Sequence, residues 1–275
     1  MITSWIKSII RTLGYDSVRR TDDPVLRDLL DVYRDLRLAP DNPVLWEDRL
    51  AQPASFSHLR NLLRSKPIDL VIDVGANVGQ FASRVRRLGY VGTIVSFEPA
   101  RSTRAVLESA AAGDPRWIIR PEALGRARGK GNLEIYADST FSSLNVINDL
   151  GRERFGGLVD AVGREVVEIA PLDMLLGEIA PGGPRCILLK TDTQGHDREV
   201  LAGAAATLKD TVVVLSEASA TPIYDKAAGL SELMRDMERE GFTLSGIFPT
   251  GHGKPPNMAL LELDCFFVRK STLTV

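Results

Sequence analysis

The pattern that most constrains this chain is a regular alternation of short apolar segments with longer amphipathic ones, beginning at residue 67. A run such as Ile68–Val74 is almost wholly apolar, as expected of a strand that is covered on both faces. Strands that alternate with helices predict βαβ units, and therefore a parallel sheet with right-handed crossovers. The expected strands are Ile68–Val74, Thr93–Phe97, Trp117–Ile119, Arg185–Thr191 and Thr211–Ser216, with turn-and-helix segments at Gly75–Leu88 and Arg198–Leu208.

Two parts of this region depart from plain alternation. Asn132–Ala137 and Glu165–Ile169 have strand character and flank a polar loop, so we expect an insertion before the fourth core strand. Near the end, the helix Leu230–Glu240 precedes Phe242–Phe248 and Ala259–Arg269, two strands joined by a loop rich in Gly and Pro. The sequence therefore predicts an α/β fold whose sheet is mostly parallel and carries an antiparallel C-terminal hairpin.

The first 66 residues lack strand patterning, so we divide the chain into a helical N-terminal extension, 1–66, and one α/β domain, 67–275. We expect a helix at Pro24–Leu38 with Asp23 as its N-cap. One apolar stripe consists of Ile2, Trp5, Ile6, Ile9, Ile10 and Leu13, and a later one of Phe56, Leu59, Leu62 and Leu63. Such stripes are typical of helices that pack on the parent domain or form a homodimer contact, and an interfacial membrane helix is the alternative. No uncharged apolar run reaches the roughly 18 residues of a membrane-spanning helix.

Charge and cysteine content exclude several kinds of partner. The formal net charge is -2, and Lys and Arg are interspersed with Asp and Glu, so we expect no nucleic-acid partner. Cys186 and Cys265 lie in apolar runs typical of buried strands, which argues against a disulfide or a zinc site and favours a reducing compartment. With no signal peptide evident, we expect a cytoplasmic protein.

The strongest motif is Val71–Phe81, in which a buried strand ends in an acid and a glycine turn opens a helix. Gly75 and Gly79 let the backbone pass close to a ligand, because neither carries a side chain. Their spacing is not G-x-G-x-x-G, the pattern that holds a pyrophosphate, which speaks against a nicotinamide-dependent dehydrogenase and favours a ligand without phosphates. Asp73 supplies an acceptor for a cationic amino group.

Two further elements follow on the next strands. Glu98 ends the second strand about 20 residues beyond the glycine turn, where an acid can accept two ribose hydroxyls. A solvated charge would explain Glu98 alone, but its offset from the Asp73 motif favours the ligand. Pro121–Gly125 follows the third strand, where an adenine would lie, and Leu124 can frame such a base.

In order and spacing these motifs resemble the FkbM-type methyltransferases, within the class I S-adenosylmethionine-dependent enzymes. The segments that carry the resemblance are Ile72–Gly79, Phe97–Pro99, Ser142–Leu144, Leu189–Gly195, Glu199–Leu201 and Gly246–Pro249. The resemblance spans residues 67–270 and implies a Rossmann-like domain that binds S-adenosyl-L-methionine. The implied cofactor contacts are Asp73, Gly75, Ala76, Asn77, Gly79, Phe81, Glu98, Pro99, Ala123 and Leu124. One departure is Gln194, since many members have Glu at this position.

The acceptor side is expected at the carboxyl ends of the later strands. Asp192 ends the fourth strand and is the first candidate for a general base, because an alkyl or sugar hydroxyl is a poor acid. His196 is the second candidate, with a helix-surface role as its alternative. Glu217 ends the fifth strand, so Asp192 and Glu217 can jointly hold a divalent cation such as magnesium, or bind the acceptor hydroxyls directly.

The expected acceptor is a hydroxyl. The loop Ser142–Asn145 carries hydroxyls and an amide that suit a sugar, and Tyr224 and Gly251–Lys254 are expected to border the same pocket. Some members of the family that this chain resembles methylate glycan hydroxyls, and others act on polyketides. We therefore predict O-methyl transfer to a sugar in a glycan, a glycolipid or a glycosylated natural product. The alternatives are a polyketide-type acceptor and a non-catalytic Rossmann-like binding or scaffold protein.

Overall fold

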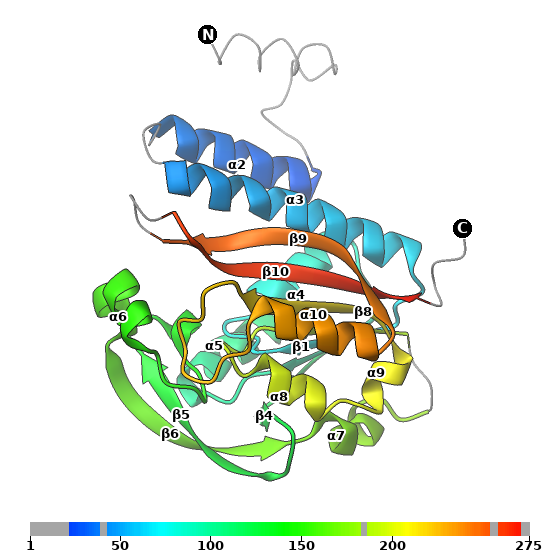
Figure 1. Ribbon diagram of the computed structural model, residues 1–275. Helices are drawn as coiled ribbons and strands as arrows, with labels where there is room; N and C mark the ends of the chain where they lie inside the picture. The colour runs from blue at the N-terminus through cyan, green and yellow to red at the C-terminus, as the bar shows by residue number, and fades with distance from the viewer. Residues whose placement is uncertain (1–21, 39–42, 183–185, 254–257, 271–275) are drawn as a thin grey trace.

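The structure, a computed structural model, describes residues 22–38, 43–182, 186–253 and 258–270. Its centre is a seven-stranded sheet in the order β3-β2-β1-β7-β8-β10-β9 (Figure 1). The parallel strands are β1 (Leu70–Val74), β2 (Thr93–Phe97), β3 (Trp117–Arg120), β7 (Ile187–Thr191) and β8 (Thr211–Ser219). The strand β10 (Leu260–Arg269) pairs antiparallel with both β8 and β9 (Phe242–His252). The predicted α/β fold with an antiparallel C-terminal hairpin is confirmed.

Helices cover both faces of this sheet, because alternate residues of each strand point to opposite sides. On one face, Leu70, Ile72 and Val74 of β1 join a core formed with four helices. These are α7 (Leu172–Ile179), α8 (Asp197–Ala202), α9 (Thr207–Asp210) and α10 (Leu230–Arg239). On the other face, Val71 packs in a core with α3 (Pro43–Ser65), α4 (Gln80–Arg87) and α5 (Arg101–Ala111). All five residues of β1 are therefore buried, which is why four of the five are apolar and the exception is Asp73.

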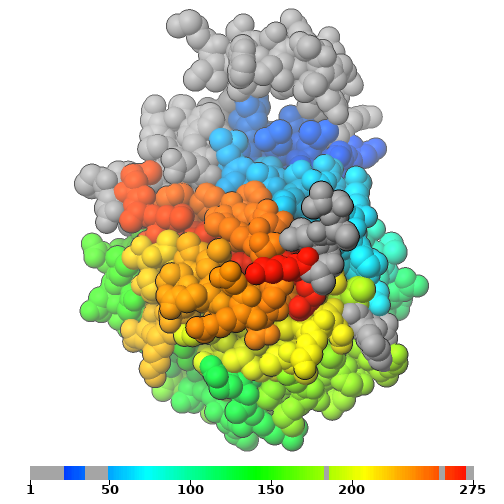
Figure 2. Space-filling view, turned by 45° about the vertical axis from the view of Figure 1, so that its right-hand side comes forward, coloured from blue at the N-terminus to red at the C-terminus, as the bar shows by residue number. Residues whose placement is uncertain are grey.

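The N-terminal helices lie across the C-terminal hairpin. α2 (Pro24–Leu38) and α3 lie side by side above β9 and β10 (Figure 1), and Figure 2 shows their blue and cyan surface bordering the orange strands. The expected N-cap is present, since Asp23 Oδ1 accepts from the backbone N of Val25 at 2.9 Å. His58 Nε2 on α3 is 2.9 Å from Ser245 Oγ on β9. The expected packing on the parent domain is thus found for α2 and α3, whereas the Ile2–Leu13 stripe lies outside the described residues.

The predicted insertion forms a small sheet of its own. Antiparallel strands β5 (Gly129–Tyr136) and β6 (Ala161–Ala170) join the short β4 (Ala123–Leu124) in the order β4-β6-β5. The connection from β5 to β6 contains η1 (Ser139–Phe141), α6 (Asp149–Phe155) and η2 (Gly156–Val159). Ser143 Oγ donates to the backbone oxygen of Gln194 at 2.8 Å, so the loop is tied to the segment that follows β7.

Some helices differ from expectation, and the differences do not alter the fold. The helix expected at Arg198–Leu208 is divided into α8 and α9, and α5, α6 and α7 are additional helices that the sequence pattern did not predict. Within the described part of the chain, no helix combines the length and the apolar character needed to cross a bilayer.

Candidate active site

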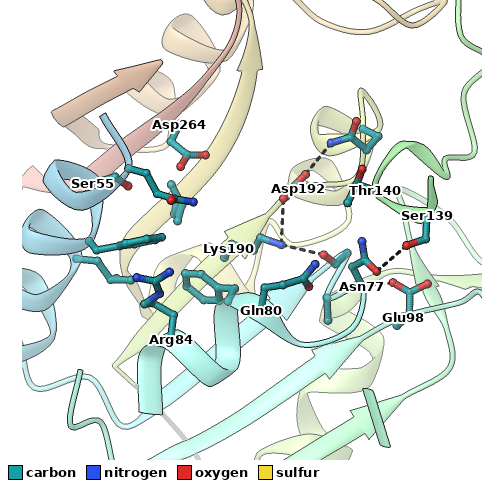
Figure 3. Close-up of a pocket in the computed structure, with 18 of the residues that line it drawn as sticks. Ser55, Asn77, Gln80, Arg84, Glu98, Ser139, Thr140, Lys190, Asp192 and Asp264 are labelled. Carbon is teal, nitrogen blue, oxygen red and sulfur yellow. Dashed lines mark hydrogen bonds and ion pairs between the residues drawn. The ribbon is translucent and has the colours of Figure 1, made fainter. Parts of the chain in front are cut away.

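Two cavities open at the carboxyl ends of the parallel strands and share part of their walls. The helix-side cavity extends between α3, α4 and the sheet (Figure 3), and the insertion-side cavity extends toward β4 and β5. Residues that line both are Gly75, Glu98, Ser139, Ser142 and Asp192. Because open α/β sheets bind ligands at this end of their strands, we treat the two cavities as one cleft.

Glu98 lies where the two cavities meet, directly after β2. Its Oε2 accepts from the backbone N of Asn77 and its Oε1 from the backbone N of Ala100, each at 2.9 Å. Burial raises the pKa of Glu98 above its usual value, although these two backbone bonds act in the opposite direction. Each carboxylate oxygen retains a further lone pair, so Glu98 can still accept hydrogen bonds from two ligand hydroxyls.

The other expected cofactor contacts divide between the two cavities. Pro99, Ala123 and Leu124 line the insertion-side cavity, and these three side chains provide an apolar surface that suits a planar base. Ala76, Asn77 and Phe81 line the helix-side cavity. Eight of the ten expected contacts therefore face the cleft, counting Gly75 and Glu98 with these six, and the exceptions are Gly79 and Asp73.

The glycine turn serves the packing of the protein itself. Gly75 has a φ of 73°, and a Cβ there would lie 1.9 Å from the backbone oxygen of Asp192. Gly79 has a φ of 91°, and its Cβ would lie 2.8 Å from Leu107 Cδ1 and 2.9 Å from Trp117 Cη2. Both positions thus require glycine because of protein neighbours, and Gly79 lies against α5 and β3, away from the cleft.

Asp73 is buried beneath the cleft. Its side chain is fully covered, with Oδ1 3.1 Å from Lys190 Nζ and Oδ2 accepting from Ser96 Oγ at 3.2 Å. Asp73 and Lys190 are directly paired in the β1–β7 register, with their side chains on the same face. Burial lowers the pKa of Lys190, but attraction to Asp73 and then to Asp192 outweighs it and raises the pKa overall. Asp73 therefore stabilises the buried ammonium group and lines neither cavity.

Asp192 directly follows β7 and is held by two neighbours. Its Oδ2 is 3.4 Å from Lys190 Nζ, and its Oδ1 accepts from Gln194 Nε2 at 3.0 Å (Figure 3). The same Nε2 donates to Glu217 Oε2 at 2.9 Å, and Gln194 Oε1 accepts from the Tyr224 hydroxyl at 2.8 Å. Because a carboxylate can only accept hydrogen bonds, the NH₂ group of Gln194 is the one that faces Asp192. The Asp192 side chain is still 40% exposed to the cleft.

Further acids lie beside Asp192. Glu217 and Asp264 are opposite each other in the β8–β10 register. Burial raises the pKa of Glu217 well above its usual value, and the carboxylates of Glu262 and Asp192 add to the shift. Burial also raises the pKa of Asp264 to about 7, again with a contribution from Asp192. Glu217 and Asp264 therefore keep their protons to higher pH than ordinary carboxyl groups, which favours Asp192 as the proton acceptor.

The site fits a divalent cation poorly. The Gln194 NH₂ group donates to both Asp192 and Glu217, where a shared cation would require acceptors only. In the described residues no group of three or more His, Cys, Asp and Glu side chains is arranged to hold a metal ion. The geometry thus gives no support to the expected magnesium site.

Three other residues that were expected near the acceptor pocket lie in different environments. His196 precedes α8 and lines the insertion-side cavity, and burial lowers its pKa and favours the neutral ring. Tyr224 does not border the cleft but lies beneath it, 1% exposed. His252 is the last residue of β9 and is buried, with its backbone oxygen accepting from Arg154 Nε at 2.8 Å. Of the catalytic candidates, Asp192 is the one that lines both cavities.

α3 contributes residues to the cleft that the sequence alone did not predict. Gln52, Ser55 and Phe56 line the helix-side cavity, although the apolar stripe that contains Phe56 predicts only burial. The Phe56 ring lies 3.6 Å from the guanidinium carbon of Arg84 on α4. No local signal marks these positions, because they reach the cleft only through the way α3 crosses β9 and β10.

Comparison with known protein families gives one match. Residues 73–244 match the methyltransferase FkbM domain, and this segment is more than half of the chain. It contains Asp73, Glu98, the insertion, Asp192, Gln194 and Glu217. A search of curated protein sequences finds no match.

Solved structures with partial similarity are methyltransferases. An rRNA methylase from Streptococcus thermophilus is 7% identical, with a TM-score of 0.44 over 80% of this chain and 96% of the other. Fibrillarin of Aeropyrum pernix, solved with bound S-adenosyl-L-methionine, is 12% identical, with a TM-score of 0.43 over 78% and 74%. Precorrin-6y C5,15-methyltransferase of Geobacter metallireducens is 10% identical, with a TM-score of 0.44 over 79% and 89%. At these TM-scores, the similarities do not establish the fold or the function of this chain.

Proposed function

The chain belongs to the FkbM methyltransferase family, and on that premise we propose that it transfers a methyl group to a hydroxyl oxygen. It is an S-adenosylmethionine-dependent methyltransferase with a Rossmann-like α/β fold. The observation that carries the hydroxyl proposal is the Asp192 carboxylate, which faces both cavities while Gln194 and Lys190 hold it from the protein side.

The donor set of the cleft fits S-adenosylmethionine. Glu98 has free lone pairs for the ribose hydroxyls, and Pro99, Ala123 and Leu124 offer an apolar frame for the adenine. The turn at Gly75–Asn77 borders the adjoining cavity, where the methionine part would lie. When bound, S-adenosylmethionine supplies a methyl group on positively charged sulfur, which keeps the electron pair of the broken sulfur–carbon bond.

Asp192 acts as the general base in this proposal. The acceptor's O–H proton moves to the Asp192 carboxylate as the new oxygen–methyl bond forms. Gln194 is a positioning residue, because its hydrogen bond to Oδ1 holds the carboxylate in one orientation. Lys190 balances the negative charge before transfer and is itself anchored by Asp73. No step requires a metal ion, and His196 on the insertion side is the second candidate for the base.

A sugar is the proposed acceptor class. The polar side chains of the helix-side cavity are largely amides and hydroxyls, which hydrogen-bond neutral polyols through both donors and acceptors. They include Gln52, Ser55, Gln80, Ser139, Thr140 and Ser142. The sugar would belong to a glycan, a glycolipid or a glycosylated natural product, and a polyketide-type hydroxyl is the second candidate.

Transfer of labelled methyl from S-adenosylmethionine into a glycolipid and polysaccharide extract of the source organism tests the proposal. We expect label in carbohydrate that depends on the wild-type enzyme. Label confined to a non-carbohydrate component would favour the polyketide alternative. No label in any component, together with no demethylated cofactor, would favour the non-catalytic alternative.

Several expectations from the sequence remain predictions. They are the division at residue 66, the cytoplasmic location, a homodimer contact through the N-terminal helices, and the absence of a nucleic-acid partner.

A further inference from the structure

The helix-side cavity has a wall that comes from outside the matched family segment. Gln52, Ser55 and Phe56 of α3 line it, whereas the family match begins at residue 73. Facing them are Arg84 of α4 and Asp264 of β10 (Figure 3). The cavity encloses about 290 Å³, close to the lower end of the range for small-molecule sites.

The cationic groups of this cavity are neutralised by the protein itself. Lys190 pairs with Asp73 and Asp192, and Arg84 pairs with Asp28 of α2. Asp264 has its pKa raised by burial to about 7, so it is partly protonated at neutral pH. Because an anionic group would lose its hydration there without gaining an unpaired cation, the wall formed by α3, α4 and β10 disfavours an anionic ligand. The methionine part of the cofactor would lie on the other side of the cavity, against the turn Gly75–Asn77 (Figure 3).

The remaining wall groups suit an uncharged ring that carries hydroxyls. The amides of Gln52 and Gln80 each offer donors and an acceptor, and the Ser55 hydroxyl offers both. Phe56 and Phe81 supply apolar surface for the carbon atoms of such a ring.

We propose that α3 is the acceptor-specificity element of this enzyme, with Gln52 and Ser55 hydrogen-bonding an uncharged, hydroxyl-bearing ring against Phe56. This inference rests on the proposed O-methyl transfer, since it assigns the ring to the same acceptor. It adds that selection among acceptors depends on residues that the family match does not contain.

A binding experiment tests this without requiring turnover. The probes are methyl pyranosides of the gluco, galacto and manno series, titrated into the full chain saturated with S-adenosylhomocysteine and followed by saturation-transfer NMR. Variants Gln52→Ala and Ser55→Ala are compared with Asn61→Ala, which removes an amide from an exposed position of the same helix outside the cavity. We expect at least one pyranoside to bind the wild type and Asn61→Ala equally, and the other two variants about 3- to 10-fold more weakly.

Affinity for S-adenosylhomocysteine, measured by calorimetry, should be equal in all four proteins, because none of the expected cofactor contacts lies on α3. Pyranoside binding that is equal in all four proteins would overturn the role of α3, and so would the failure of every pyranoside to bind. Methyl labelling of the extract is a separate measurement. If the extract is labelled but pyranoside affinity is unchanged in the α3 variants, the proposed function stands and only the role of α3 is wrong. If the extract is not labelled, the proposed function itself is wrong.

Discussion

At the scale of single residues, the proposed scheme assigns proton transfer to Asp192 and cofactor recognition to Glu98. For Asp192→Asn we expect kcat to fall by about 10²- to 10⁴-fold, because an amide cannot take the acceptor's proton. The affinity for S-adenosylmethionine should change little, since the expected ribose and adenine contacts lie elsewhere in the cleft. Steady-state kinetics and calorimetry measure the two quantities.

The control for this substitution is Asp225→Asn, which removes a carboxylate from an exposed position near Tyr224. Near-normal kcat in Asp192→Asn would remove Asp192 from the chemistry and leave His196 as the candidate. EDTA should leave the wild-type rate unchanged. Loss of activity in EDTA, restored by magnesium, would contradict the metal-free scheme.

Glu98→Ala should weaken binding of S-adenosylhomocysteine by about 1–3 kcal/mol, the free energy associated with hydrogen bonds to a charged group. The substitution also leaves the backbone N–H groups of Asn77 and Ala100 without their acceptors, which loosens the turn beside the ligand. Calorimetry compares it with Glu108→Ala, an exposed position on α5. Unchanged affinity in Glu98→Ala would show that the assigned role of Glu98 is wrong, and binding of NAD without binding of S-adenosylhomocysteine would overturn the cofactor assignment.

At the scale of secondary structure elements, the turn after β1 is fixed by its contact with the residue after β7. In Gly75→Ala, the new Cβ would overlap the Asp192 backbone oxygen, and the positive φ adds about 1–2 kcal/mol for a residue with a side chain. We expect the free energy of unfolding in urea to drop by more than about 2 kcal/mol.

The matched control is Gly129→Ala at the start of β5, where a Cβ meets no atom within 4 Å. This variant should stay within about 0.5 kcal/mol of the wild type. Equal stability of the two variants would mean that the chain relieves the overlap at Gly75 by moving the segment after β7.

The elements that could be predicted from the sequence are those whose burial or strand-end position leaves a local pattern. β2 spans Thr93–Phe97, as expected, because a strand that is covered on both faces is short and rich in apolar residues. The strand-end rule likewise predicts Glu98 and Asp192, each of which directly follows a parallel strand. The hydrogen bonds of Gln194 and the position of α3 could not be predicted, since both depend on contacts between segments distant in the sequence.

At the scale of the whole molecule, a net charge of -2 conceals an uneven distribution of buried and partly buried acids. They gather near the carboxyl end of β7 and the adjoining β8 and β10 and comprise Asp192, Asp197, Glu217, Glu262 and Asp264. The folded protein has a pKa of about 7 at Asp264, whereas an Asp in the unfolded chain titrates near 4. The contribution of Asp264 to the free energy of unfolding is therefore greatest below about pH 4 and is lost as the pH rises through about 7.

In Asp264→Asn, the loss of stability that accompanies ionisation of Asp264 should be absent. Relative to the wild type, the variant should gain on the order of 1–3 kcal/mol in free energy of unfolding between pH 5 and pH 8. Urea denaturation at the two pH values measures the gain. A difference between variant and wild type that is the same at both pH values would show that ionising Asp264 costs the fold nothing.

The position of β10 shows that the segment matched by the family model is shorter than the sheet that folds as one unit. The family match ends at residue 244, inside β9, yet β10 lies between β9 and β8 in the sheet. A fragment trimmed to the homologous boundaries would turn β8, an interior strand, into an open edge whose backbone groups invite pairing with other chains. Transplanting this domain into another protein, or recombining it with relatives, therefore requires a cut placed beyond Arg269.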